Sequence, residues 1–163
     1  MSILRSFLLA LALSSVSVAA PAATPMGTAP PAGQAMAAVH QFVDNFNSGN
    51  TKEMLAACAP ATNILDDFPP HVWSGSGACA AWASALEAAN KAQGMGGEKV
   101  TLSAPTTEMV TGNVAYIVVP ASLVFTQRGK AMTQTGATWT LVVRKMSGGW
   151  RITAWAWADG KSS

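Results

Sequence analysis

A pair of neighbouring carboxylates, Asp66 and Asp67, directly follows the apolar residues Ile64 and Leu65. A carboxyl group inside an apolar pocket has a raised pKa, because burial disfavours its charged form, and it can then take a proton near neutral pH. Side chains alternate along a strand, so an extended segment would point only one of the two acids inward. We expect Asp66 to be a candidate catalytic base and Asp67 to be solvated. The alternative for Asp66 is a structural carboxylate that accepts backbone hydrogen bonds.

Other chemical signals in the chain are sparse. His71 is a candidate proton shuttle, because histidine as a residue type can exchange a proton near neutral pH, but we favour an exposed loop histidine. Two cysteines and two scattered histidines lack the clustered spacing of a zinc site. The chain also lacks a phosphate-binding glycine loop and a nucleophile elbow. We therefore expect no metal and no cofactor, and the sequence leaves open whether the protein is an enzyme.

Tryptophans are concentrated near the end of the chain. Strict alternation over 150–158 places Trp155 and Trp157 on one face of a strand and Trp150 with Ile152 on the other. Two tryptophans on one face can line a pocket and stack on a flat ligand. They can equally form an aromatic patch at a protein interface. The sequence alone does not choose between these two interpretations.

Composition limits the classes of protein that the chain can be. It has 163 residues, of which 50% are hydrophobic and 11% charged, with a formal net charge of +2. This length fits one ordinary domain with a sizeable core rather than a disordered chain. The small charge excess does not form the basic stripe of a nucleic-acid-binding protein. We expect no nucleic-acid partner.

The N-terminus has the pattern of a secretory signal peptide. Arg5 precedes an unbroken apolar run over 7–13, and small residues over 17–20 offer a cleavage site. The apolar run is too short to span a bilayer, so we expect no membrane association once the leader is removed. We predict a signal peptide over 1–20, cut within 19–23, a disordered Pro/Ala-rich spacer over 21–34, and a domain over 35–160. The protein is then periplasmic or secreted.

Export changes the interpretation of the two cysteines. Cys58 and Cys79 would pass through an oxidising compartment, where a structural disulfide persists, and only one pairing is possible. We favour this disulfide; the alternative is two buried thiols.

The apolar spacing predicts helices first and strands afterwards. We expect helices over 35–46, from 51 to before Pro60, and over 78–92, with Thr51 and Ser76 as caps. A short strand is a candidate over 62–67, and 94–97 is expected to be a loop. Four strands are predicted over 100–110, 114–126, 132–145 and 150–158, of which the first is an edge strand broken by Pro105. In the third of these, Trp139 is expected to face one way and Gln134 the other. Helices packed on an antiparallel sheet make an α+β fold.

Four local patterns resemble the nuclear transport factor 2-like (NTF2-like) superfamily, which includes SnoaL-like proteins and ketosteroid isomerases. They are Phe42-Val43-x-x-Phe46-Asn47-x-Gly49-Asn50, Ile64-Leu65-Asp66-Asp67, Gly75-x-x-Ala78-x-x-x-Trp82 and Gly149-Trp150-Arg151-Ile152. The resemblance implies a cone, in which three N-terminal helices pack on a curved antiparallel sheet around a mostly apolar pocket. It often implies a homodimer through the sheet. In this fold we expect Trp73 to cover the open end of the cone. The expected pocket residues are Phe42, Phe46, Ile64, Trp73, Trp82, Trp155 and Trp157.

The isomerase pattern fits this chain only in part. Laid along the chain, it places Asp66 at the position of the general base, but Phe42 stands where the oxyanion tyrosine would be. The second oxyanion acid falls near Ala137 or Thr138. Loss of each oxyanion donor costs about 100- to 1000-fold in rate, so we do not expect steroid isomerisation. The supporting tyrosines fall near Cys58 and Ala83, which suggests a disulfide between the second and third helices.

Three functions follow as hypotheses. The first, which we favour, is an exported protein whose pocket binds a small, mainly apolar or aromatic molecule without turning it over. The second is an acid–base enzyme (an isomerase, lyase or hydrolase) that depends on Asp66. The third is a dimeric interaction module that uses Trp155 or Trp157 on its sheet.

Overall fold

The computed structural model describes residues 33–163. The predicted signal peptide over 1–20 lies outside the described residues, and so does most of the predicted spacer over 21–34. The last two spacer residues, Gly33 and Gln34, form a turn, in which the Gly33 N–H donates to Oε1 of Glu108. No helix of the part that the structure describes is long and apolar enough to cross a membrane.

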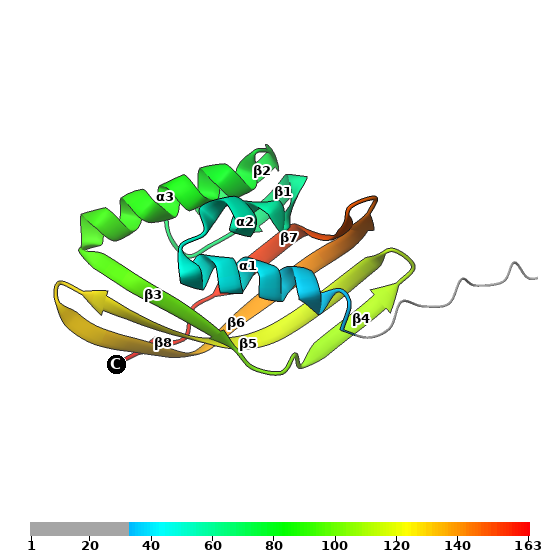
Figure 1. The fold of residues 1–163 in the computed structure, drawn as a ribbon. Helices are drawn as coiled ribbons and strands as arrows, with labels where there is room; N and C mark the ends of the chain where they lie inside the picture. The colour runs from blue at the N-terminus through cyan, green and yellow to red at the C-terminus, as the bar shows by residue number, and fades with distance from the viewer. Residues whose placement is uncertain (1–32) are drawn as a thin grey trace, which may run out of the picture.

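Three helices cover one side of a strongly curved sheet (Figure 1). The elements in chain order are α1 (Met36–Ser48), α2 (Thr51–Ala56), β1 (Cys58–Leu65), β2 (Val72–Ser76), α3 (Ala78–Gln93), β3 (Met95–Leu102), β4 (Thr107–Thr111), β5 (Val114–Gln127), β6 (Lys130–Met146), β7 (Gly149–Ala158) and β8 (Lys161–Ser162). Helix α1 contacts β3 and β7, and α3 contacts β1, β2 and β3. The predicted α+β cone is confirmed.

The sheet is mixed, which corrects the expectation of a purely antiparallel one. Its strand order is β2-β1-β7-β6-β5-β3, with β4 also paired to β5 and β8 to β6. All pairs are antiparallel except β1 with β7, where Ile64 lies opposite Trp155 in a parallel pair. Strands β1 and β2 also separate the first two helices from α3, so the helices do not all precede the sheet. The sequence pattern missed β2 and β8 because both are short.

The N-cap residues of α2 and α3 each lie one position away from the predicted ones. The side chain of Asn50, rather than that of Thr51, caps α2 by accepting from the Glu53 N–H at 3.4 Å. Gly77 precedes α3 because Ser76 belongs to β2. The predicted loop over 94–97 is mostly strand, since only Gly94 takes the left-handed cap conformation and β3 begins at Met95. The predicted strand over 100–110 is two strands, interrupted around Pro105.

Helix α1 is fixed to the edge strand β3 by one side chain. The Asn47 amide donates to the Val100 carbonyl at 2.7 Å and accepts from the Val100 N–H at 2.8 Å. This double hydrogen bond satisfies a strand residue at the edge of the sheet, where backbone groups otherwise lack partners. It holds β3 against the helix and defines one wall of the interior.

Two bulges decide which side chains face the helices. In the β6–β7 pair, Val143 lies opposite Ile152 but Val142 lies opposite Ala154, so Thr153 is an extra residue. The bulge reverses the alternation, and as a result Trp155 and Trp157 face inward like Trp150 and Ile152. The predicted separation of these two pairs onto opposite faces is therefore wrong.

The second bulge lies in β6. Ala121 pairs with Ala137 and Leu123 pairs with Gln134. Between these two pairs β6 contains one residue more than β5. Gly136 has a φ of 76°, a conformation that glycine adopts without a steric penalty. Gln134 is consequently buried on the same side as Trp139, whereas strict alternation predicts opposite faces.

The predicted disulfide is present between Cys58 and Cys79, whose Cα atoms are 6.5 Å apart. It joins the beginning of β1 to α3 rather than α2 to α3, because α2 already ends at Ala56. The bond therefore holds the third helix against β1, the second strand from one edge of the sheet.

Candidate functional site

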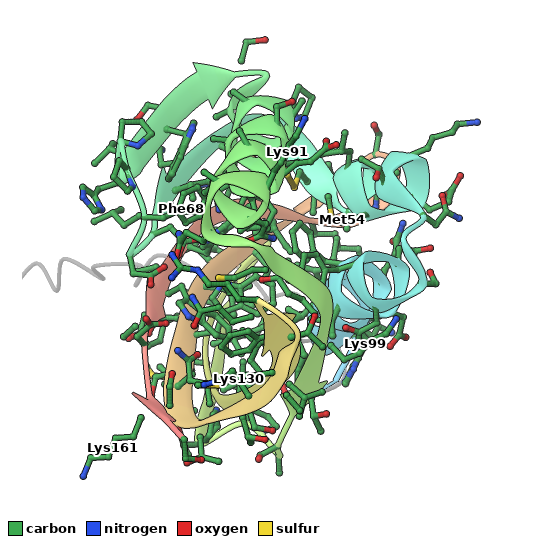
Figure 2. All side chains as sticks on the ribbon, turned by 90° about the vertical axis from the view of Figure 1, so that its left-hand side faces the viewer. Met54, Phe68, Lys91, Lys99, Lys130 and Lys161 are labelled. Carbon is green, nitrogen blue, oxygen red and sulfur yellow. A yellow bond between two sulfur atoms is a disulfide. The ribbon has the colours of Figure 1, made fainter. Side chains whose placement is uncertain are left out.

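A cavity of about 300 Å³ lies between α1, α3 and the concave face of the sheet. Most of its wall is apolar. Eight aromatic rings line it: Phe42, Phe46, Phe68, Trp82, Phe125, Trp139, Trp155 and Trp157. Figure 2 looks into this interior, with α3 above it and the turn between β5 and β6 in front.

Phe42 is at the centre of the aromatic wall. Its ring centroid lies 5.8 Å from that of Trp82, 5.5 Å from Trp139 and 5.4 Å from Trp155, all in tilted or edge-on contacts. Trp82 and Trp155 meet edge-to-face at 5.2 Å. These are favourable geometries for aromatic pairs.

Five of the seven residues predicted to form the pocket line the cavity: Phe42, Phe46, Trp82, Trp155 and Trp157. Ile64 and Trp73 do not line it. They lie opposite each other in the β1–β2 pair, and Ile64 is fully buried in the core. Trp73 packs against Phe68 at 5.0 Å rather than over the open end of the cone.

Asp66 lines the cavity and is held by two hydrogen bonds. Nε1 of Trp82 donates to its Oδ2 at 2.7 Å, and the Asp67 N–H donates to its Oδ1 at 2.9 Å. Burial raises the pKa of Asp66 above its usual range, while the hydrogen bonds from Asp67 and Trp82 oppose the rise. Trp82 therefore positions the carboxylate toward the cavity.

Asp67 also lines the cavity, in contrast to the prediction that only one acid can point inward. The alternation argument fails because β1 ends at Leu65, before both acids. Burial raises the pKa of Asp67 as well, while the neighbouring Asp159 side chain opposes the rise.

Asp159 is a third acid at the same site, which the sequence analysis missed. It follows β7, and Nε1 of Trp157 donates to its Oδ1 at 3.0 Å. Burial raises the pKa of Asp159, and the neighbouring Asp67 side chain raises it further. The Trp157-x-Asp159 spacing at the end of β7 is the signal that could have found it. We call Asp66, Asp67 and Asp159 the acidic cluster.

A buried amide lies beside this cluster. Gln134 is 6% exposed and lines the cavity, and its nearby side-chain amide lowers the pKa of Asp159. Its Oε1 atom is buried without a hydrogen-bond partner. An unsatisfied buried acceptor costs about 1–3 kcal/mol, so a donor from a bound molecule would be favourable here.

His71 does not contribute to the cavity. Its side chain is exposed, and its Nδ1 lies 3.1 Å from the main-chain oxygen of Asp66 rather than from the carboxylate. Within residues 33–163, no group of three or more His, Cys, Asp or Glu side chains is arranged to hold a metal ion. The chemistry available at the site is that of carboxylates and aromatic rings.

The position of Asp159 depends on the glycine that follows it. A Cβ atom on Gly160 would overlap the Thr135 carbonyl oxygen and lie 2.7 Å from the Ala137 nitrogen, and these backbone atoms cannot move aside. We expect Gly160→Ala to detach β8, at a cost of about 1–3 kcal/mol. The Thr133 and Ser163 amides, which bond each other's carbonyl oxygens, should then lose protection in hydrogen exchange.

Gly148→Ala is the matched control for Gly160→Ala. A Cβ atom on Gly148 would meet only the flexible end of the Arg151 side chain, at 3.4 Å. Protection of the Thr133 and Ser163 amides should therefore be unchanged in this variant. If these two amides were equally protected in Gly160→Ala and in the wild type, the close approach of Gly160 to the Thr135 carbonyl would be contradicted.

The raised pKa values predict a pH dependence of stability. A folded carboxyl with a raised pKa binds its proton more tightly than the unfolded chain does. Its stabilising contribution is fully present below the unfolded pKa near 3.8 and is lost as the pH rises through the folded pKa. We expect Asp67→Asn to raise the urea midpoint near pH 7, with a gain in the free energy of unfolding of less than about 1 kcal/mol because the side chain is exposed. The effect should be smaller near pH 4.

Asp44→Asn, on the exposed side of α1, removes the same charge away from the cavity. Its effect should be small and similar at both pH values. A lower urea midpoint for Asp67→Asn near pH 7 would show that the folded state favours the ionised acid.

The architecture described above defines the class of protein: it is an NTF2-like α+β fold with a cavity under its helices. The chain matches the SnoaL-like domain family over residues 35–156 and belongs to that family. No curated protein matches it.

Solved structures support the same fold. A putative scytalone dehydratase from Novosphingobium aromaticivorans is 11% identical, with a TM-score of 0.64 over 80% of this chain and 84% of that one. An NTF2-like superfamily protein from Salmonella enterica is 15% identical, with a TM-score of 0.63 over 77% and 88%. A ketosteroid isomerase-like protein from Erwinia carotovora is 13% identical, with a TM-score of 0.60 over 77% and 93%. At these identities the likeness shows the fold alone.

Proposed function

We propose that this protein is an exported, periplasmic or secreted, binding protein that holds a small, mainly apolar or aromatic molecule in its cavity. The observation that carries the proposal is the aromatic wall around about 300 Å³ of space, which is at the lower end of small-molecule sites. Phe42, which takes the place of an oxyanion donor in the isomerase pattern, is part of that wall and cannot donate a hydrogen bond.

Two observations support export. The pattern over 1–20 is that of a secretory leader. The disulfide between Cys58 and Cys79 is of the kind that persists in oxidising compartments. Mass spectrometry of the protein recovered from the periplasm or medium would give its N-terminus. An uncleaved N-terminus beginning at Met1 in the cytoplasmic fraction would contradict export.

Binding can be tested with N-phenyl-1-naphthylamine, a neutral probe whose fluorescence rises in apolar surroundings. We expect the wild-type protein to bind it and Trp157→Ala to bind it about tenfold more weakly, because the indole ring forms part of the wall. Tyr116→Ala is the control, since this ring is exposed and lies outside the cavity. No fluorescence change with the wild type, or equal binding by all three proteins, would overturn the proposal.

An acid–base enzyme is the second candidate function, favoured by one observation. Asp66 lines the cavity with a pKa raised by burial, and Trp82 fixes its orientation. A general base needs this combination of position and proton affinity. Native mass spectrometry of the purified protein would reveal any co-purifying molecule, which then serves as the test substrate. Asp66→Asn should abolish its turnover while Asp44→Asn should not; retained turnover would remove Asp66 from the mechanism.

Association into a homodimer through the sheet remains a prediction, but its interface cannot use the tryptophans first considered. Trp155 is 3% exposed and Trp157 lines the cavity, so neither is available for a surface patch. Met109 and Tyr116 lie opposite each other on β4 and β5, and both are exposed. Light scattering at micromolar concentration would test the dimer, and a monomer would contradict it.

A further inference from the structure

The ionisable side chains that line the cavity are all acids. They are Asp66, Asp67, Glu98 and Asp159, which make up half of the eight Asp and Glu residues in the chain. Among residues 33–163, no lysine, arginine or histidine lines the cavity. The labelled lysines belong to surrounding elements, and Lys161 points away from the interior (Figure 2). When these acids ionise, no basic side chain lining the cavity in the described part of the chain compensates their negative charge.

Three of these acids are concentrated at one place. Asp66 and Asp67 are chain neighbours, and the Asp67 and Asp159 carboxyl groups are close enough for each to change the pKa of the other. Carboxylates this close repel each other when ionised, since the charge on each disfavours the charge on the next. A positive group placed among them would relieve this repulsion and gain charge-assisted hydrogen bonds.

Gln134 provides a second, independent indication of what belongs there. The side chain is more than nine-tenths buried and lines the cavity, and its Oε1 atom accepts no hydrogen bond. Oε1 can only accept, so the group that completes the site must be a hydrogen-bond donor. An anionic group without a donor would leave Oε1 unpartnered and would add to the repulsion.

Aromatic rings adjoin this polar end of the cavity. Trp157 donates to Asp159 and its ring lies 6.3 Å from that of Trp139, which in turn lies 6.0 Å from Trp155. Tryptophan faces attract cations, and the same rings offer stacking surface to a flat apolar body. One end of the cavity is thus suited to a cation and the remainder to an aromatic group.

We propose that the occupant of the cavity is a small aromatic amine in its protonated form. Its ammonium N–H groups donate to Oε1 of Gln134 and to the acidic cluster, and its ring system packs against the tryptophans. This inference rests on the proposed function, since it specifies the chemical class of the molecule that the cavity binds.

Three naphthalene compounds of similar size separate charge from shape. They are 1-naphthylmethylamine, a cation near neutral pH, 1-naphthylmethanol, which is neutral, and 1-naphthoate, an anion. Calorimetric titration of the wild-type protein near pH 7 and at low salt should show the amine binding about tenfold or more tighter than the alcohol. We expect no measurable binding of the naphthoate.

Variants of the cavity residues then show which side chains bind the ammonium group. Asp159→Asn and Gln134→Leu should each weaken amine binding about tenfold and change alcohol binding by less than about threefold. Asp44→Asn removes a charge from the exposed side of α1 and should leave both affinities unchanged. Asp159 is at the exposed end of the cavity, so its variant is expected to fold even if Gln134→Leu does not.

The outcomes distinguish the inference from the proposed function. If N-phenyl-1-naphthylamine binds but the alcohol or the naphthoate binds as tightly as the amine, the cavity is a binding site and the cation inference is wrong. An amine affinity that is unchanged in Asp159→Asn also overturns the inference. If neither the fluorescent probe nor any naphthalene compound binds, the proposed function fails, and the inference fails with it.

Discussion

Phe42→Ala is expected to lower the free energy of unfolding by about 3–5 kcal/mol, the range for removing a buried phenylalanine ring. The ring is 4% exposed and contacts three tryptophans, at centroid distances of 5.4–5.8 Å. Its loss would remove three aromatic pairs and join new empty space to the existing cavity. Urea unfolding followed by tryptophan fluorescence measures the change directly.

Phe46→Ala is the matched control, because it makes the same substitution one turn later on α1. Phe46 is only partly buried at the edge of the core. Its loss should cost clearly less than that of Phe42. Equal costs for the two variants would show that the aromatic cluster is not the centre of the fold's stability.

Removing the disulfide is the second change with a large expected effect. Cys58 and Cys79 are 21 residues apart, and closing a loop of this size stabilises the folded state by about 3 kcal/mol in the chain-entropy model. Cys58→Ala with Cys79→Ala should lower the unfolding free energy by about that amount. Alanine is preferred to serine, because both cysteines are buried and a hydroxyl would lack a partner.

Chemical reduction supplies an independent check on the disulfide. Wild-type protein unfolded in the presence of a reductant should show a urea midpoint close to that of the double alanine variant. The double variant itself should be insensitive to reductant. A wild-type midpoint that does not respond to reductant would mean that the bond does not form in solution or contributes nothing.

The sequence predicted the repetitive parts of this fold well. Apolar residues at helical spacing marked α1 and α3, and alternation marked β5, where Ala115, Ile117 and Val119 are fully buried as expected. Each of these elements is regular, so local pattern and tertiary environment agree. The disulfide was also predicted, because two cysteines allow only one pairing.

The candidate site could be predicted only in part, because irregular backbone forms much of it. One extra residue at Thr153 turns Trp155 and Trp157 inward, and another near Gly136 does the same for Gln134. A bulge leaves little trace in the amino-acid composition. The prediction therefore assumed strict alternation through both bulges and assigned the residues beyond them to the wrong face. Asp67 was wrongly expected to point away from the cavity and Asp159 was missed for a related reason, since both lie just beyond the end of a strand, where alternation no longer applies.

The parallel pairing of β1 with β7 has a consequence for the order of folding. Ile64 finds its partner Trp155 only in the last long strand. Contacts this distant in sequence raise the contact order and slow folding, because much of the chain must be ordered before they form. Without β7, β1 and β2 would form an isolated pair of strands, and such a pair is marginally stable in water. The chain therefore cannot complete its fold progressively from the N-terminus, and its cooperative core forms only once the C-terminal strands are present.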